Sequence, residues 1–481
     1  MRSPALAFAN AANLRAPHPG RAWEFDAGSA WIVTLLTWLL IALMTVPDNL
    51  DYESLNTSYA PSEGSPISRV LWLVLLAAPL LVIIWRRMLA ALLMRWLNPF
   101  LVMFVLLAVA SMAWSDYPDV TARRLIRVLA VLLNAIAFVL VGWHAGRFQS
   151  GVRPALTAML LGSIIFGLLR PDLAIHQETS AELLHAWRGL TNHKNTLGDA
   201  ASIGFILWFH AWITRDGKRW VALLGAAIAG ACLVLSRSST SLMGSLAVAM
   251  LLPVLVWAPA RWRKLITPVV VLGLVVLVTY SVVILGLVPG LEILLKPISH
   301  LTGKDLTFSG RTDIWAIIVR HIHLHPLLGS GYGGYWIGPY PWAPVYEFLQ
   351  KLHFYPGSAH NGYLEIINDL GIAGFSVLIG YIGLLLRDAL RLFHVDQAQG
   401  ALIIGLFFQQ AIANLAETHW FSVLSLDFTI VTLATAALAR NLLERRLRDY
   451  FGEPEIEFGL RPRPEPELVQ VVAPAGAGWA S

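Results

Sequence analysis

Residues 265–288 read LITPVVVLGLVVLVTYSVVILGLV and contain no charged side chain. A helix of about 20 such residues, rising about 1.5 Å per residue, crosses the ~30 Å hydrocarbon core of a bilayer. Apolar runs of similar character recur along the 481-residue chain and alternate with short polar joints. Strands of a membrane β-barrel would instead give segments of about ten residues with every second position apolar. The pattern therefore predicts an all-α polytopic membrane protein.

The amino-acid composition indicates the same class. Hydrophobic residues make up 57% of the chain and charged residues 14%, whereas a soluble domain has roughly 45–50% apolar and about 25% charged residues. The net charge of +5 does not indicate a nucleic-acid partner, because the basic residues do not gather on a soluble face. The single cysteine, Cys232, leaves no internal disulfide and no thiol metal site.

About 12 transmembrane helices are expected. Residues 30–438 are predicted to form the transmembrane domain, residues 1–29 a cytoplasmic tail without a cleavable signal peptide, and residues 439–481 a cytoplasmic, largely disordered tail. The expected spans are 30–46, 70–85, 98–114, 125–143, 155–169, 200–214, 219–235, 241–258, 265–288, 372–387, 400–416 and 419–438.

The basic residues predict which side each joint faces. Joints after even-numbered spans are short and rich in Lys and Arg, as is the C-terminal tail, and this is the cytoplasmic pattern. The joint 47–67 after the first span carries acids and no Lys or Arg. Both termini are therefore expected in the cytoplasm, and two large loops, about 170–199 and 289–371, on the outer face.

The first of these loops contains a dense polar motif. The stretch Trp187-Arg-Gly-Leu-Thr-Asn-His-Lys-Asn-Thr-Leu-Gly198 places Arg188, His193, Lys194 and Asn195 directly before an apolar span. A helix that begins there would direct free N–H groups and its positive dipole end toward the surface. These groups could form a binding site for a pyrophosphate. The alternative is that Asn192 or Asn195 only caps the helix and the cations contact lipid headgroups.

Further arginines lie in other outer segments. Arg237 stands in a short Ser-Arg-Ser turn, and Arg311 lies four residues before Trp315 in Ser309-Gly-Arg-Thr-Asp-Ile-Trp315. Arg311 and Trp315 would share one helical face. Arginines gathered at the outer surface favour a cationic pocket for phosphate, with a structural Arg–Trp stack near the headgroups as the alternative.

The stretch His325-Pro-Leu-Leu-Gly-Ser-Gly-Tyr-Gly-Gly-Tyr-Trp336 is glycine-rich. Glycines permit tight turns and close backbone approach, but this is no nucleotide-binding phosphate loop because no Lys-Ser/Thr follows them. Aromatic side chains interleave with the run and either stack on sugar rings or lie in the interfacial belt. They are Tyr332, Tyr335, Trp336, Tyr340 and Trp342.

The stretch Ser358-Ala-His-Asn-Gly-Tyr-Leu-Glu places His360 at the start of a helix that continues into a span. A neutral imidazole there can act as a base near physiological pH, and Glu365 or Asp369 is expected to orient it or to balance nearby arginines. A contact between this histidine and lipid headgroups is the alternative.

Gln410, Asn414 and Glu417 are spaced four and three apart and are expected on one helical face at the outer end of the span 400–416. A charged carboxylate inside a membrane costs from about 2.5 kcal/mol upward, and an outer arginine beside it would offset that cost. We expect Glu417 to be a partner of the site and no catalyst. The sequence has no Asp-x-Asp, Cys/His cluster or HExxH, so no metal-ligand set is evident.

Taken together, these motifs resemble the O-antigen ligase/polymerase superfamily over roughly residues 100–420, with ExoQ-type exopolysaccharide production proteins as the most similar branch. The motifs are His-Lys-Asn before a span, the Ser-Arg-Ser turn at 236–238, Gly-Arg-x-x-x-Trp, His-Pro-Leu-Leu-Gly-x-Gly and His-Asn-x-Tyr-Leu-Glu followed by Gly-Ile-x-Gly. The resemblance implies a GT-C-like architecture in a bacterial inner membrane, with the active face in the periplasm.

The resemblance also implies an inverting glycosyl transfer from an undecaprenyl-diphosphate-linked oligosaccharide, without metal or other cofactor. His360, Arg311 and Arg188 match the family's catalytic positions. Further implied partners are an acceptor glycan or lipid A-core, membrane lipids, a flippase and a chain-length regulator. The residues expected to bind substrate are His193, Lys194, Asn195, Arg237, Asn361, Glu365 and Glu417.

Three functions remain open at this point. A polymerase of lipid-linked repeat units and a ligase that moves a finished chain to lipid A-core need the same donor site and differ in the acceptor. A lipid-linked sugar flippase or other transporter would favour charges along a central cavity and on both sides of the membrane. The expected spans are nearly free of charge at their centres, which favours the two transferases.

Overall fold

The computed structural model describes residues 27–47, 50–53, 55, 65–177, 183–284, 311–338, 340–422 and 425–451. Regular structure in these residues is helical, apart from an isolated bridge between Ile175 and Trp187. The helices are α2 (Ala27–Thr45), α3 (Pro66–Trp85), α4 (Arg87–Met94), α5 (Pro99–Ala110), η3 (Ser111–Ala113), α6 (Pro118–Val141), η4 (Ala145–Arg147), α7 (Phe148–Leu169), α8 (Pro171–Ala174), α9 (Lys194–Thr214), α10 (Arg219–Leu235), α11 (Ser239–Val256), α12 (Arg263–Ile284), α14 (Arg311–Leu324), α15 (Tyr346–Leu352), α16 (Gly362–Phe393), α17 (Gln397–Ala413) and α18 (Leu426–Phe451).

Within the described residues, six helices are long and apolar enough to cross a membrane, namely α3, α6, α7, α11, α16 and α18. The adjoining helices α4 and α5–η3 pass the same test as a pair bent by 100°, and α2 and α10 contain shorter apolar helices. An all-α polytopic membrane protein is therefore confirmed. Each of the twelve expected ranges overlaps a helix, while a total of twelve membrane crossings stays a prediction.

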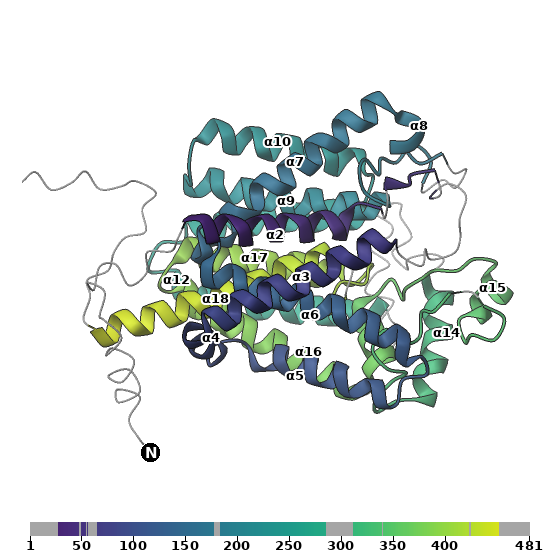
Figure 1. The fold of residues 1–481 in the computed structure, drawn as a ribbon. Coiled ribbons are helices and arrows are strands. Elements are labelled where there is room, and N and C mark those ends of the chain that lie inside the picture. The colour runs from purple at the N-terminus through teal and green to yellow at the C-terminus, as the bar shows by residue number, and fades with distance from the viewer. Residues whose placement is uncertain are drawn as a thin grey trace, which may run out of the picture.

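The two ends of the helix bundle carry different short helices (Figure 1). The short helices α8, α14 and α15 lie at one end, and α4 and the C-terminal end of α18 lie at the other. At the second end, ion pairs connect segments that are distant in the sequence. Arg153 pairs with Asp216, and Arg147 pairs with Asp396. The first end, with its loops and short helices, is where the polar motifs meet.

Burial separates central helices from peripheral ones. The apolar window of α18 is 83% buried and that of α6 is 67% buried, whereas that of α3 is only 22% buried. Exposed side chains on the outer helices are large and apolar, including Leu81, Met250 and Val276. An apolar outer surface of this kind is suited to lipid and would be unfavourable in water.

Helix α16 is broken at Gly371, where φ is 62° and ψ is −160°. Two helical hydrogen bonds are replaced at the break by bonds to the glycine-rich run. The N–H groups of Ile372 and Ala373 donate to the carbonyls of Pro326 and Leu327 at 2.9 and 3.2 Å. A backbone segment inserted into the i→i−4 ladder is a recognised cause of a helix kink.

The two helical carbonyls released by the break are satisfied by the same run. Those of Asn368 and Asp369 accept from the N–H groups of Ser330 and Gly331, each at 3.0 Å. The exchange keeps every one of these backbone groups hydrogen-bonded, as a buried break requires. The backbones of the glycine-rich motif and the Gly371 motif are therefore hydrogen-bonded to each other, and the histidine motif precedes the same helix α16.

Replacing Gly371 by alanine is expected to lower the thermal unfolding temperature of the purified protein. The backbone of Gly371 lies in a region of about 1–3 kcal/mol strain for other residues, and an added Cβ would collide with the backbone of Leu327. Gly383→Ala is the matched control, because among the described residues nothing lies within 4 Å of a Cβ at that site of α16. Equal unfolding temperatures for the two variants would contradict this account of the break.

Candidate functional site

Helix α17 ends at Ala413 and α18 begins at Leu426, so residues 414–425 are not part of either helix where they are described. The expectation that Gln410, Asn414 and Glu417 share one helical face is therefore wrong. Asn414 caps α17, and its Oδ1 accepts from the N–H groups of His419 and Trp420 at 2.9 and 2.7 Å. This side chain folds the segment back on itself and turns Glu417 toward the outer loops.

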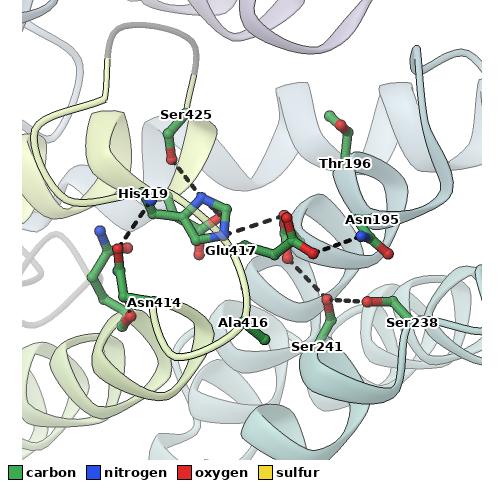
Figure 2. Close-up of polar contacts among 12 residues, drawn as sticks. Asn195, Thr196, Ser238, Ser241, Asn414, Ala416, Glu417, His419 and Ser425 are labelled. Carbon is green, nitrogen blue, oxygen red and sulfur yellow. Dashed lines mark hydrogen bonds and ion pairs between the residues drawn. The ribbon is translucent and has the colours of Figure 1, made fainter. Parts of the chain in front are cut away.

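The carboxylate of Glu417 joins three residues from distant parts of the chain. Its Oε1 accepts from Nδ2 of Asn195 at 2.7 Å, which Figure 2 shows, and from Nη2 of Arg311 at 3.0 Å. Its Oε2 accepts from Nδ1 of His360 at 3.1 Å. Arg311 also donates through Nη1 to the carbonyl of Ala416. We call Glu417, Asn195, Arg311 and His360 the Glu417 cluster.

Helix starts bring the three partners to Glu417. Asn195 is the second residue of α9, and the N–H group of Asn195 donates to Nδ1 of the capping His193 at 3.2 Å. Arg311 is the first residue of α14, and His360 lies two residues before α16. Positive ends of three helix dipoles therefore converge on one surface, which favours an anion there.

The backbone directly before His360 is held in place by two hydrogen bonds. Nε1 of Trp315 donates to the carbonyl of Ala359 at 3.0 Å, and the N–H group of Ala359 donates to Oε2 of Glu365 at 2.7 Å. His360 itself has a φ of 46°, a left-handed conformation that is costly for a residue with a side chain. Arg311 and Trp315 are one turn apart on α14, so this helix positions both the arginine and the histidine of the cluster.

Charges around Glu417 set its ionisation. Burial alone would raise the pKa of this carboxyl group, but His360 and Arg311 outweigh that effect and hold the pKa well below its ordinary value. Glu417 is therefore an anion at neutral pH. The side chains of Glu417, Arg311 and His360 are 14%, 23% and 28% exposed, so the cluster is partly open to a ligand.

His193 does not supply a cation. Burial, with a smaller contribution from His176, lowers the pKa of His193 to about 4, so its imidazole is neutral at physiological pH. Its ring caps α9 through Nδ1. Lys194 is partly exposed beside it, and this lysine is the positive charge that the His-Lys-Asn motif brings to the surface.

Arg188 is placed differently from Arg311. It is 1% exposed, its Nε donates to the carbonyl of Leu173 at 2.7 Å, and its backbone N–H donates to the carbonyl of Ala174. These contacts join the two sides of the first outer loop. In this structure Arg188 therefore stabilises the first outer loop. Its side chain is too deeply buried to contact a ligand directly.

The remaining predicted residues also take distinct places. Asn361 is 1% exposed and caps α16 through bonds from the N–H groups of Tyr363 and Leu364. Arg237 is exposed and donates to the carbonyl of Leu184. Glu365 orients the peptide before His360, whereas the imidazole itself is held by Glu417. The expectation that Glu365 or Asp369 orients the ring is therefore corrected.

Glu365 and Asp369 face a separate small cavity of about 30 Å³, which is room for water molecules and no sugar ring. Oδ2 of Asp369 accepts from the N–H group of Gly333 at 2.8 Å, and Arg124 donates to the carbonyl of Trp336 at 2.8 Å. Tyr332 and Trp336 are 3% exposed, so they pack in the interior and stack on no sugar. Tyr340 and Trp342 are stacked and exposed.

Sequence reasoning missed a second polar group beside the Glu417 cluster. Asp199, His419 and Asp427 come together in the interior, although the sequence shows no metal-ligand motif. The available signal was an acidic residue inside or next to an expected span, which is costly in a membrane and therefore marks a function. Asp427 falls inside the expected span 419–438 and Asp199 directly precedes the span 200–214.

Comparison with known proteins identifies the region that contains these motifs. Residues 224–379 match the O-antigen ligase family. This part of the chain is similar to the O-antigen ligase family. Arg237, Arg311 and His360 fall within it, while Asn195 and Glu417, which complete the cluster, lie outside the matched residues.

The chain is also similar to the exopolysaccharide production protein ExoQ of Rhizobium meliloti (strain 1021), with 27% identity over 288 residues. The aligned region covers 57% of this chain, and the chain spans about 61% of the length of that relative. The resemblance to the O-antigen ligase and ExoQ group is therefore confirmed.

Replacing Glu417 by glutamine is expected to lower the unfolding temperature at neutral pH, because it removes the charge that Arg311 faces. A carboxyl group whose pKa is depressed in the folded state stabilises the fold above its ordinary pKa, about 4.5, and loses this contribution as the pH falls toward the folded value. The gap between wild type and Glu417→Gln should therefore narrow steadily as the pH falls below about 4.5.

Glu347→Gln is the matched control for this titration. Glu347 pairs with Arg320 and Lys351 at an exposed site, where such pairs contribute only about 0–1 kcal/mol. Its unfolding temperature should stay near that of wild type at every pH. A gap for Glu417→Gln that does not change between pH 7 and pH 3.5 would contradict the proposed ionisation of Glu417.

Proposed function

We propose that the protein is a polysaccharide polymerase, which extends a glycan held on undecaprenyl diphosphate by inverting glycosyl transfer on the periplasmic face of a bacterial inner membrane. The observation that carries the proposal is the Glu417 cluster, which couples an imidazole and a guanidinium through one buried carboxylate. The family relationship supports the class of reaction. The lipid carrier, the inversion and the polymerising acceptor are our inference.

His360 is the proposed general base. With Nδ1 donating to Glu417, the neutral ring has its lone pair on Nε2, and this atom has no hydrogen-bond partner among the described residues. Nε2 takes the proton of the acceptor hydroxyl while the acceptor oxygen forms a bond to the anomeric carbon. The carboxylate of Glu417 stabilises the imidazolium that results, as a carboxylate does in other pairs of this kind.

Arg311 and Lys194 are proposed to bind the lipid diphosphate. As the bond between the anomeric carbon and the phosphate oxygen breaks, its electron pair moves to the diphosphate, and fixed positive charge lowers the energy of that state. The starts of α9 and α14 add N–H groups and positive dipole ends. Arg188 is proposed to shape the loop that carries Lys194. The step as proposed uses side chains only and needs no metal ion at the reacting atoms.

The proposed orientation follows from the charges at the two ends of the bundle. The end opposite the Glu417 cluster carries many basic residues, among them Arg86, Arg87, Arg147, Arg153 and Arg440, and basic joints stay in the cytoplasm. We infer that both termini are cytoplasmic, with residues 1–29 and 439–481 outside a membrane domain of 30–438. Helix α18 continues to Phe451, so the expectation of a largely disordered tail is wrong for residues 439–451. A flippase that supplies the donor and a chain-length regulator are proposed partners.

Two other functions compete with this proposal. A ligase would use the same donor site with lipid A-core as acceptor, and nothing in the Glu417 cluster separates it from a polymerase. A lipid-linked sugar transporter is disfavoured, because the cluster and the motifs lie at one end of the bundle. The ExoQ similarity favours the polymerase, since that relative is named for exopolysaccharide production.

The test is reconstitution of the purified protein in lipid with an undecaprenyl-diphosphate-linked repeat unit as the only glycan. A ladder of longer lipid-linked products is expected. Transfer that appears only after lipid A-core is added would replace the polymerase by the ligase. Inward or outward movement of the donor without any new glycosidic bond would contradict both transferases.

Variants of the cluster should lose this activity while the protein remains folded. We expect His360→Gln to slow ladder formation by about 10²–10⁴-fold, as for loss of a general base. Arg311→Ala should cost about 10²–10³-fold, as for loss of a group that stabilises developing charge. Controls are His323→Gln and Arg320→Ala, exposed positions on the same helix α14. Full activity in either cluster variant would refute the site.

A further inference from the structure

Asp199, His419 and Asp427 form a buried group next to the Glu417 cluster. They come from α9, from the segment 414–425 and from α18, and their candidate ligand atoms all lie within 4.8 Å of one another. Figure 2 shows His419 with Ser425 on one side and carboxylate oxygens on the other. The three residues are 6%, 7% and 2% exposed, so water does not solvate their polar atoms freely.

The spacing in this group is too long for direct hydrogen bonds. Nε2 of His419 lies 3.5 Å from Oδ2 of Asp199, and Nδ1 lies 3.9 Å from Oδ2 of Asp427. A charge-assisted N–H···O bond is about 2.7–2.9 Å long. By contrast, two ligand atoms on one tetrahedral ion with bonds of about 2.1 Å are about 3.4 Å apart. The distance between Asp199 and His419 therefore fits two ligands of a shared ion.

Two of the facing atoms have no other partner. Nε2 of His419 and Oδ2 of Asp427 are buried and make no hydrogen bond to any described residue. A buried polar atom left in this state costs about 1–3 kcal/mol, and more when it is charged. Both atoms belong to side chains that are more than nine-tenths buried, and each of the three residues has a candidate ligand atom within 4.8 Å of the others.

The outer atoms of the group are fixed by serines. Oγ of Ser241 donates to Oδ1 of Asp199 at 2.8 Å and is itself bonded to Ser238. Nδ1 of His419 pairs with Oγ of Ser425 at 2.9 Å. A histidine that donates through Nδ1 presents the lone pair of Nε2, and partners of this kind commonly orient metal ligands.

We propose that Asp199, His419 and Asp427 bind a first-row divalent metal ion, with Zn²⁺ or Mn²⁺ as the chemical class. Two carboxylates and an imidazole are side-chain ligands that commonly bind a divalent ion of this class. Mixed imidazole and carboxylate ligands suit borderline transition metals better than Mg²⁺ or Ca²⁺.

The ion would position Glu417. Asp199 lies one turn after Asn195 on α9, and His419 lies two residues after Glu417 in the same segment. A metal ion between Asp199 and His419 would therefore hold α9 and the segment 414–425 at the spacing that the Asn195–Glu417 bond requires. Metal binding itself does not depend on the proposed glycosyl transfer, so the two can fail separately.

The experiment measures metal content in the full-length protein, purified without chelator and dialysed, by mass spectrometry of the elements. One tightly held Zn²⁺ or Mn²⁺ per chain is expected, together with a rise in unfolding temperature when that metal alone is added back to chelated protein. Asp199→Asn and Asp427→Asn should lose both effects. Asp172→Asn, an exposed aspartate on α8, should retain both.

Ser241→Ala covers the case in which the ligand variants do not fold. It keeps all three ligands and removes one orienting bond, so metal affinity should fall by about 10–100-fold. Wild-type protein without bound metal and without a thermal shift would overturn the proposal. Equal metal content in wild type, Asp199→Asn and Asp427→Asn would also overturn it, because the ion would then sit elsewhere on the chain.

Discussion

The carboxylate of Glu417 is the constraint on which the arrangement of the outer face depends. It is mostly buried, and its oxygens are taken by Asn195 at the start of α9, Arg311 at the start of α14 and His360 before α16. Each partner alone would be a polar residue near a membrane surface. Joined through one anion, they fix three helix starts relative to one another, and the hydrogen bond from His360 together with the charge of Arg311 keeps Glu417 ionised at neutral pH.

The broken helix α16 explains why the site lies where it does. The glycine-rich run satisfies the backbone groups that the break at Gly371 releases, so the first turns of α16 can lean away from the rest without unpaired N–H or carbonyl groups. His360 sits just before those turns. Motifs far apart in the sequence thus meet at the break in α16 and in the Glu417 cluster. The cluster is partly open to solvent, which is compatible with a lipid-linked substrate.

The sequence was sufficient for the class of fold, because apolar runs long enough to cross a bilayer have few other uses. It was also sufficient to single out Arg311 and His360, whose motifs are local. It failed at the end of α17, since nothing local in Ala413–Glu417 shows that Asn414 would cap the helix and turn the chain. Arg188 and the group of Asp199, His419 and Asp427 could not be assigned, because their burial and proximity arise only when distant helices pack.

The most direct test of the account is a double-mutant cycle between His360 and Glu417, measured as the initial rate of glycan transfer in lipid. If Glu417 acts by holding and stabilising the imidazole of His360, then in a background of His360→Gln the further change Glu417→Gln should cost much less than it does in the wild type, since groups that act as a unit are strongly non-additive. Losses that simply multiply, so that the double variant is slower by the product of both single effects, would show that the two residues act independently and would contradict the central claim.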